Sequence, residues 1–212
     1  MSDKQYAFYF DSTACTGCKA CQIACKDKHD LDVGVTWRKV YEVSGGDWVQ
    51  NGNSYVNSVF SYYLSMACNH CANPICVEVC PTKAIEKRDD GIVLIDQDTC
   101  IGCRYCEWAC PYGAPQFQED VGRMSKCTLC YDYIDAGKPP ACVAACPSRA
   151  LDFGTVEELE AKYGKVADIQ KVAEIYPLPD ASLTEPSLIV KPHKDAVRIA
   201  NQPAMIANKE EV

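Results

Sequence analysis

The sequence predicts an α+β fold built from two interleaved modules, which are related by a pseudo-twofold axis. A β-hairpin insertion and an extended C-terminal tail complete the predicted fold. Three observations carry this prediction. All cysteines fall into four quartets of similar spacing, which indicates an internal repeat. An alternating apolar pattern flanks a Gly-Gly pair, and prolines recur through the last part of the chain.

The four quartets account for all 16 cysteines. They are Cys15, Cys18, Cys21 and Cys25; Cys68, Cys71, Cys76 and Cys80; Cys100, Cys103, Cys106 and Cys110; and Cys127, Cys130, Cys142 and Cys146. A proline follows each of the last three quartets. The first and third have the Cys-x2-Cys-x2-Cys-x3-Cys spacing with which bacterial ferredoxins bind iron–sulfur clusters. The sequence therefore predicts four 4Fe–4S clusters as cofactors, all 16 cysteines as ligands, and electron transfer as the chemistry.

Other roles for the cysteines are weaker. Disulfides stabilise small secreted scaffolds, whereas a chain of 212 residues with 48% hydrophobic content can bury a core without them. Structural zinc uses Cys-x2-Cys pairs, but it does not need three cysteines within seven residues and a fourth soon after. Inert buried thiols would not repeat this arrangement four times.

The order of the quartets predicts the module boundaries. The first and fourth form one pair and the second and third another, as if one bacterial-ferredoxin-like module were inserted within the other. The expected organisation is an outer module of residues 1–34 plus 125–175, a β-hairpin insertion of residues 35–66, an inner module of residues 67–124, and a proline-rich tail of residues 176–212 that docks on a partner subunit.

Each unit is expected to contain a short strand, a cluster loop and a short helix that carries the last cysteine. Apolar residues predict strands at 6–10 and 91–96. The expected cluster helices are residues 20–28, 75–79, 107–109 and 141–145. A further amphipathic helix is predicted for residues 155–161, because Thr155 and Glu158 form a capping-box pattern.

Two segments lie outside the cluster loops. The runs 37–43 and 55–64 flank Ser44-Gly45-Gly46-Asp47 and predict a hairpin with a long tip. We expect it to shield clusters from water, with a docking surface for a partner as the alternative. In the tail, the apolar stretch 187–190 is expected to lie along another subunit. Five prolines punctuate this tail: Pro177, Pro179, Pro186, Pro192 and Pro203.

Charge and hydropathy exclude several classes of function. The formal net charge of −8 argues against nucleic acid as a partner and against a basic membrane-binding surface. No apolar run has the length that a direct membrane span requires. Residues 1–8 contain neither a basic segment before a long apolar core nor an Arg-Arg pair. We therefore expect a protein that is cytoplasmic or is carried across a membrane by a partner with an export signal.

The sequence offers no catalytic site. Of the three histidines, His70 alone lies inside a cluster loop, and we expect it to form a hydrogen bond near its cluster. A Rieske site needs two histidines in place of two cysteines. Neither a Ser-His-Asp arrangement nor a Gly-x-Gly-x-x-Gly fingerprint is present.

Several stretches make the sequence resemble a known family. They are Cys15-Thr16-Gly17-Cys18-Lys19, Gly45-Gly46-Asp47-Trp48, Cys68-Asn69-His70-Cys71, Cys100-Ile101-Gly102-Cys103-Arg104-Tyr105-Cys106, Cys110-Pro111-Tyr112-Gly113-Ala114-Pro115-Gln116 and Arg149-Ala150-Leu151-Asp152-Phe153-Gly154. The sequence is similar to the iron–sulfur electron-transfer subunits (B subunits) of bacterial dimethyl sulfoxide reductases, within the complex iron–sulfur molybdoenzymes. The resemblance covers roughly residues 3–160.

This resemblance implies a heterotrimer for anaerobic respiration. The protein would relay electrons from an integral membrane anchor that oxidises quinol to a molybdopterin-containing catalytic subunit, without catalysis of its own. It would be held peripherally at the membrane, on the periplasmic face after export with its partner, with the cytoplasmic side as the alternative. Related nitrate reductase subunits carry tryptophan where this sequence has Cys103, so all four clusters are expected to be 4Fe–4S.

The expected ligand sets follow the ferredoxin crossover, in which the last cysteine of one quartet binds the other cluster of the pair. The four sets are Cys15, Cys18, Cys21 and Cys146; Cys127, Cys130, Cys142 and Cys25; Cys68, Cys71, Cys76 and Cys110; and Cys100, Cys103, Cys106 and Cys80. The alternative is that each quartet binds its own cluster. By family analogy the first two sets face the molybdenum subunit, and the last lies nearest the quinol. Arg104, Tyr105 and Trp108 flank that last set and either pack around the cluster or contact the membrane subunit.

Two rival functions remain open at this stage. One is the same role in a polysulfide, tetrathionate or formate enzyme, because the catalytic subunit selects the substrate. The other is a free-standing soluble poly-ferredoxin, which would need neither the long hairpin nor the tail.

Overall fold

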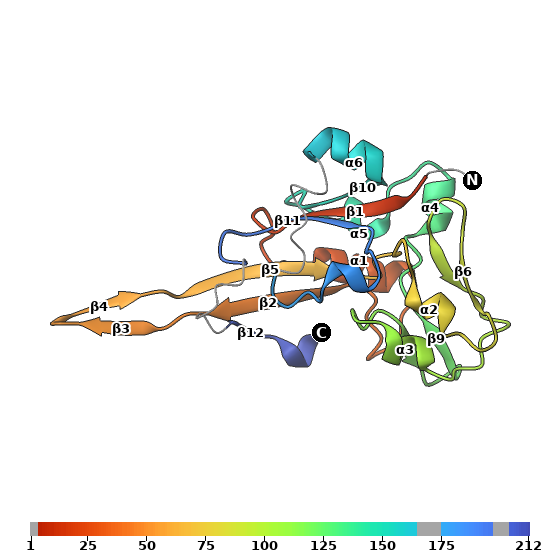
Figure 1. The fold of residues 1–212 in the computed structure, drawn as a ribbon, viewed down its shortest axis with the longest axis horizontal. Helices are drawn as coiled ribbons and strands as arrows, with labels where there is room; N and C mark the ends of the chain where they lie inside the picture. Colours follow the sequence, from red (N-terminus) through yellow and green to blue (C-terminus); the bar gives the residue numbers. More distant parts are fainter. Residues whose placement is uncertain (1–3, 165–174, 197–203) are drawn as a thin grey trace.

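The structure is a computed structural model that describes residues 4–164, 175–196 and 204–212. A mixed α/β body contains the cysteine loops, and a long hairpin extends from it (Figure 1). Expectations for residues 1–3 and 197–203, including Pro203, lie outside the described residues, as does part of the expected outer module. Within the described ranges, no helix has the length and apolar character needed to cross a bilayer.

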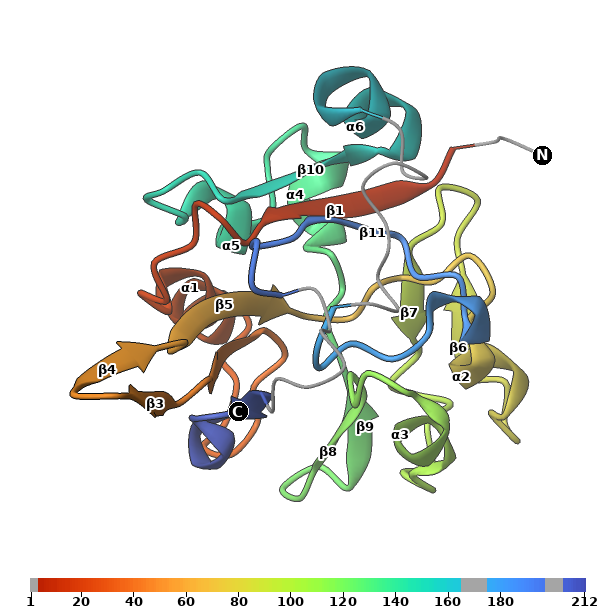
Figure 2. The ribbon, with the colours of Figure 1, turned by 60° about the vertical axis from the view of Figure 1, so that its left-hand side comes forward.

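A three-stranded sheet forms one layer of the body. Its central strand β1 (Tyr6–Asp11) pairs antiparallel with β10 (Leu151–Thr155) and parallel with β11 (Leu188–Lys191). Helix α6 (Val156–Tyr163) packs against β1 and β10, and Figure 2 shows it beside this sheet. The predicted capping box is confirmed, because Thr155 Oγ1 accepts from the Glu158 N–H at 3.2 Å and Glu158 Oε2 accepts from the Thr155 N–H at 2.8 Å.

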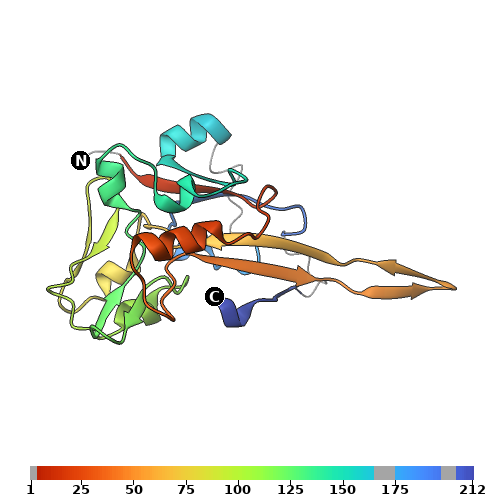
Figure 3. The ribbon, with the colours of Figure 1, turned by 180° about the vertical axis from the view of Figure 1, so that it is seen from behind.

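The long hairpin consists of two pairs of strands. At its base, β2 (Lys39–Gly45) pairs antiparallel with β5 (Phe60–Met66). At its tip, β3 (Trp48–Asn51) pairs with β4 (Ser54–Asn57), and all eight of these residues are exposed. Strand β12 (Ala204–Ile206) adds to β2. Val40, Val43 and Leu64 of the base are buried in the main core together with several cysteines, whereas the tip extends away from the body (Figure 3). Shielding of clusters by this hairpin stays a prediction.

Short elements carry the cysteine loops. The helices are α1 (Ala20–Lys28), α2 (Ile75–Glu78), α3 (Tyr105–Ala109), α4 (Tyr131–Asp135) and α5 (Ala141–Ala144). Two small antiparallel ladders accompany them, β6 (Ile85–Lys87) with β7 (Val93–Ile95) and β8 (Gln116–Gln118) with β9 (Arg123–Ser125). Two 3-10 turns, η2 (Ala181–Leu183) and η3 (Lys209–Glu211), lie in the tail. Helix α1 packs against α5, and α2 packs against α3.

The tail differs from its prediction. Its apolar stretch was expected to need the surface of another subunit, but Leu188, Ile189 and Val190 are only 4%, 1% and 0% exposed within this protein. Parallel pairing with β1 satisfies the backbone of this stretch, and the body covers its side chains. This part of the tail is therefore a strand of the body.

The main core joins the sheet to the base of the hairpin and to the cysteine loops. Phe10, Val40 and Leu64 are each at most 1% exposed and belong to one cluster of buried residues, which also contains Cys21, Cys127, Cys142 and Cys146. These four cysteines are thus part of the packed interior.

Candidate iron–sulfur cluster sites

Left-handed backbone conformations curl the cysteine loops. In the first loop Gly17 and Lys19 have φ of 68° and 59°, and in the third loop Gly102 and Arg104 both have φ of 68°. A Cβ on Gly17 would lie 2.4 Å from the Tyr63 ring, and one on Gly102 would lie 2.2 Å from the Gly122 carbonyl oxygen. Both positions therefore favour glycine by conformation. At Gly102 space requires it too, because the close neighbour is backbone, whereas at Gly17 a side chain would have to move the Tyr63 ring.

One cavity is lined by four cysteines that come from two quartets: Cys15, Cys18, Cys21 and Cys146. Burial raises the pKa of Cys15 to about 11. Burial also acts on Cys146, but donation from the Ser148 hydroxyl and from nearby backbone N–H groups leaves its pKa below the usual value. The loop thus provides donors for a sulfur atom at the place where the chain leaves the quartet.

A second cavity is lined by another four cysteines from two quartets: Cys68, Cys71, Cys76 and Cys110. Burial raises the pKa of Cys71 to about 11 and that of Cys76 to about 12. Thr184, from the tail, also lines this cavity, and its Oγ1 lies 3.3 Å from Cys71 Sγ. The tail therefore contributes to the surroundings of these cysteines.

Cys25, Cys127, Cys130 and Cys142 lie near one another. Burial raises the pKa of Cys25 to about 12, and the charges of Cys142 and Cys130 contribute to this rise. Burial raises the pKa of Cys127 well above its usual value, and the charges of Cys25, Cys68 and Cys142 raise it further. This group again combines the last cysteine of the first quartet with the fourth quartet.

The remaining cysteines gather around α2 and α3. Cys106 is buried with Ile85, Val93 and Met124, and Cys76, Cys80 and Cys100 pack against this group. Burial raises the pKa of Cys106 to about 11, with further contributions from Cys100 and Cys103. Cys80 Sγ accepts from the Ala84 N–H at 3.3 Å.

The four groups follow one another in the order of the Cys15, Cys127, Cys68 and Cys100 groups. Burial raises the pKa of Cys21 in the Cys15 group, and the charge of Cys142 in the Cys127 group adds to the rise. The charge of Cys68 adds in the same way to the pKa of Cys127, so the Cys127 group neighbours the Cys68 group. Cys76 of the Cys68 group and Cys80 of the Cys100 group pack against one apolar cluster, so these two groups are neighbours as well.

These residues fit 4Fe–4S clusters. All 16 cysteines lie in the described part of the chain, and all are free of disulfide bonds. Thiols with raised pKa values, packed together in an apolar interior, resist ionisation until a metal group takes them as thiolates. Among the described residues, no three His, Cys, Asp or Glu side chains form a site for a single metal ion. The donor set, four thiols around each of two cavities, is that of a cubane cluster.

Several polar residues surround these groups. His70 is 1% exposed, lines the cavity of Cys68 and accepts from the Val93 N–H through Nδ1 at 3.0 Å. Its predicted hydrogen bond is therefore confirmed. Lys126 is 3% exposed and lines the same cavity. Only its position beside Cys127 could have indicated it from the sequence.

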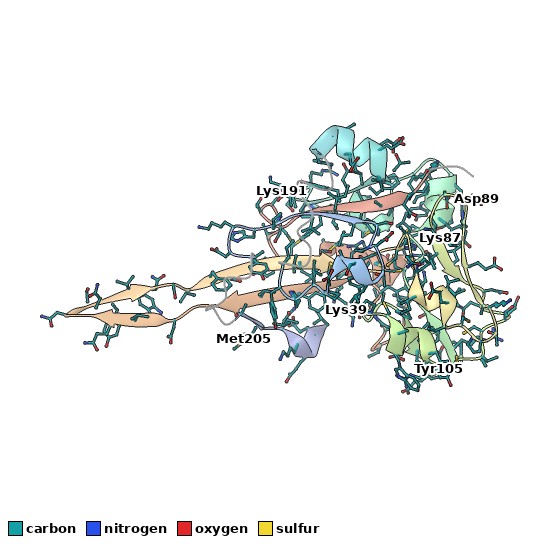
Figure 4. All side chains as sticks on the ribbon, in the orientation of Figure 1. Lys39, Lys87, Asp89, Tyr105, Lys191 and Met205 are labelled. Atoms are coloured by element: carbon teal, nitrogen blue, oxygen red, sulfur yellow. The ribbon has the colours of Figure 1, made fainter. Side chains whose placement is uncertain are left out.

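The residues that flank the third quartet are largely on the surface. Arg104 Nε lies 2.6 Å from Glu107 Oε2, and the guanidinium lies 5.3 Å from the centre of the Phe117 ring. Tyr105 and Trp108 are 51% and 72% exposed, with ring centres 5.8 Å apart. Figure 4 shows Tyr105 on the body, remote from the tip of the hairpin.

The fold and the four groups of cysteines define a protein that binds several iron–sulfur clusters. Residues 59–156 match the 4Fe-4S dicluster domain family. The sequence is 49% identical over 208 residues to the B subunit of anaerobic dimethyl sulfoxide reductase from Escherichia coli (strain K12), with 98% of each protein covered. It is 48% identical over 210 residues to the corresponding B subunit of Haemophilus influenzae, covering 99% of this protein and 100% of the relative.

A more distant relative is the B subunit of polysulfide reductase from Wolinella succinogenes, which is 36% identical over 194 residues, covering 90% of this protein and 96% of the relative. The protein belongs to the family of the anaerobic dimethyl sulfoxide reductase B subunits. The resemblance noted in the sequence is therefore confirmed. The cofactors are 4Fe–4S clusters, the cysteine count corresponds to four of them, and the role is electron transfer.

Proposed function

We propose that this protein is the non-catalytic electron-transfer subunit of an anaerobic dimethyl sulfoxide reductase. It relays electrons through four 4Fe–4S clusters from a quinol-oxidising membrane anchor subunit to a molybdopterin-containing catalytic subunit, as part of a heterotrimer. The ordered row of four cysteine groups is the observation that carries this proposal. The similarity to B subunits of dimethyl sulfoxide reductases, which extends over nearly their full length, supports it.

The proposed ligand sets are the four predicted from the ferredoxin crossover. Two sets coincide with the cysteines that line the two cavities, and these observations support them. The set of Cys127 is supported by the charges of Cys130 and Cys142, which raise the pKa of Cys25. The set of Cys100 is supported by the packing of Cys80 against the apolar cluster that contains Cys106. When bound, a 4Fe–4S cluster accepts and gives one electron at a time. The protein supplies thiolates, shields them from water and provides N–H and O–H donors to sulfur.

We also propose the interleaved organisation, with residues 1–34 and 125–175 as the outer module, 35–66 as the hairpin insertion and 67–124 as the inner module. The packing of α1 with α5 and of α2 with α3 supports a pseudo-twofold relation. The equal φ of 68° at Gly17 and Gly102 supports it as well. The exposed parts of residues 176–212 are proposed to dock on a partner, whereas β11 belongs to the body.

The location follows from the proposed complex. The protein is held at the membrane by its anchor partner, on the periplasmic face after export with the catalytic subunit. Protease added to intact spheroplasts checks this side of the membrane. Digestion only after lysis would favour the cytoplasmic side instead.

Affinity purification of this protein from anaerobically grown native cells tests the function. We expect a molybdopterin subunit and a multispanning membrane protein to accompany it, as identified by mass spectrometry. Sulfoxide reduction by the purified complex would support the proposed substrate. Reduction of polysulfide or tetrathionate, or oxidation of formate, would reassign the partner, and recovery of a soluble brown protein without partners would indicate a mobile carrier.

A further inference from the structure

Arg38 is a buried cation close to the Cys15 and Cys127 groups of cysteines. It precedes β2, is 2% exposed and is one of the largest fully buried side chains among the described residues. A charged guanidinium in a dry interior is costly unless opposite charge and hydrogen-bond acceptors surround it. The position of Arg38 therefore requires an explanation.

Only some of the hydrogen-bond donors of the Arg38 guanidinium have partners in the protein. Nη1 donates to Ser65 Oγ at 3.1 Å and to the Ser65 carbonyl at 3.4 Å, and the guanidinium lies 4.4 Å from the centre of the Phe8 ring. Among the described residues, Nε and Nη2 have no hydrogen-bond partner. None of the ion pairs found there includes Arg38.

The negative charge near Arg38 comes from cysteines. Four cysteines of two groups lie close enough to act electrostatically on its guanidinium: Cys142, Cys21, Cys127 and Cys25. Each becomes a source of negative charge once a cluster binds it as a thiolate. Cys21 belongs to the proposed site of Cys15, and the other three belong to the proposed site of Cys127. Ser65 connects the same elements, because its Oγ lies 3.3 Å from Cys21 Sγ.

We propose that Arg38 is a positioning residue that donates from Nε and Nη2 to sulfur atoms of both cluster sites and raises the reduction potential of both clusters. This inference rests on the proposed function, since it requires clusters at these two sites. Each reduction adds one electron and therefore one negative charge. A nearby cation stabilises that added charge strongly where the effective dielectric constant is low. Arginine does not lose its proton in proteins, so no proton transfer accompanies the electron.

A redox titration of the complete complex, followed by EPR, tests the proposal. In Arg38→Met we expect the reduced-to-oxidised ratio of two clusters to fall about tenfold at a fixed potential, which corresponds to about 59 mV for one electron. The other two clusters should be unchanged. Arg38→Lys keeps the charge but loses the planar fork of donors, so its shift should be smaller and confined to the same two clusters.

The matched control is Arg88→Met. Arg88 forms ion pairs with Asp90 and Asp135, and none of its hydrogen bonds among the described residues goes to a cysteine. This variant should leave all four potentials unchanged. Cysteine variants of the first two proposed ligand sets assign the two signals beforehand.

Two results would overturn the role of Arg38: unchanged potentials in a variant with full iron content, or an equal shift of all four clusters. If Arg38→Met loses iron, Arg38→Gln decides, because it removes the charge and keeps a polar amide in the space. Iron and sulfide analysis of the unsubstituted complex tests the proposed function separately. Iron short of four 4Fe–4S clusters there would count against that function, whatever the Arg38 variants show.

Discussion

At the scale of single residues, two glycines separate the effect of backbone conformation from that of space. Gly102 and Gly113 both have positive φ, 68° and 58°. A Cβ on Gly102 would meet the Gly122 carbonyl oxygen at 2.2 Å, whereas one on Gly113 would meet nothing within 4 Å. Left-handed backbone costs a residue with a Cβ about 1–2 kcal/mol.

We therefore predict that Gly102→Ala displaces the third cysteine loop and removes one cluster, whereas Gly113→Ala incurs only the conformational cost and keeps all of them. Iron and sulfide content and the EPR spectrum of the reduced protein check this. Equal iron loss in both variants would show that the close contact with Gly122 is unimportant.

Cys25 distinguishes the two possible ligand arrangements. Cys25 lies within α1 and belongs to the first quartet, but the charges of Cys142 and Cys130, from the fourth quartet, raise its pKa more than that of Cys21 from its own quartet. We predict that Cys25→Ser changes the EPR signal of the same cluster as Cys127→Ser. Cys15→Ser serves as the comparison and should change a different signal. A change shared by Cys25→Ser and Cys15→Ser would indicate that the first quartet binds its own cluster.

At the scale of elements, β11 shows how the tail stabilises the body. Ile189 in β11 is 1% exposed and packs with Ala7, Tyr9 and Leu159. Ile189→Ala should leave a cavity that costs about 2–5 kcal/mol. Leu183, 57% exposed in η2, is the control, and its substitution by alanine should cost less than about 0.5 kcal/mol.

The midpoint of thermal unfolding, measured anaerobically, checks this prediction as a difference between the two variants. Proteins with tightly bound cofactors depart from two-state unfolding, so midpoints are compared rather than free energies. Equal midpoints would show that β11 contributes little and that the tail does need a partner for its stability.

Elements encoded by local patterns were predictable. The bounds of α1, the strand at Tyr6 and the capping box of α6 follow from spacing and capping chemistry within a few residues. The partner of β11 was not predictable in this way. An apolar run indicates that some surface covers it, but it does not indicate which surface. Here the pairing with β1 joins residues about 180 positions apart in the sequence.

The same distinction applies to the sites. The cysteine quartets carry their chemistry in their spacing, so the candidate ligands could be named from the sequence. Arg38 and Thr184 follow no spacing rule. They approach cysteines only because β2 and the tail fold back onto the loops, and this long-range packing has no local signal.

At the scale of the whole molecule, the charge distribution suits electron transfer through a buried interior. The protein has a formal net charge of −8, yet the charged side chains that are most buried, Arg38 and Lys126, are cations that lie beside cysteine groups. With clusters bound at the proposed sites, these cations would offset part of the negative charge that each added electron brings.

Large apolar side chains are exposed on both faces of the tip of the hairpin, within the described part of the protein. Trp48 and Tyr55 lie on one face and Val49 and Val56 on the other, and each is between 55% and 64% exposed. Large exposed apolar groups gathered in one place commonly mark an interaction site. With the proposed subunit role, this surface is expected to contact a partner subunit.

Removal of the tip tests this role. The Asp47 carbonyl accepts from the Ser58 N–H at 2.9 Å, so these two residues already face each other across the hairpin. Replacing residues 48–57 by Asn-Gly would close the strands with a two-residue turn. We predict full iron content and unchanged EPR signals, because no cysteine lies in the tip, and at least a tenfold lower yield of co-purified partner subunits.

Val33→Ala is the control for the loss of exposed apolar surface as such. Val33 is 98% exposed and lies outside the hairpin, so its substitution should keep the partner yield. An unchanged yield in the shortened hairpin would exclude the tip as a docking surface. Loss of iron would instead support shielding of the clusters by the tip, because the deletion leaves β2, β5 and every cysteine in place.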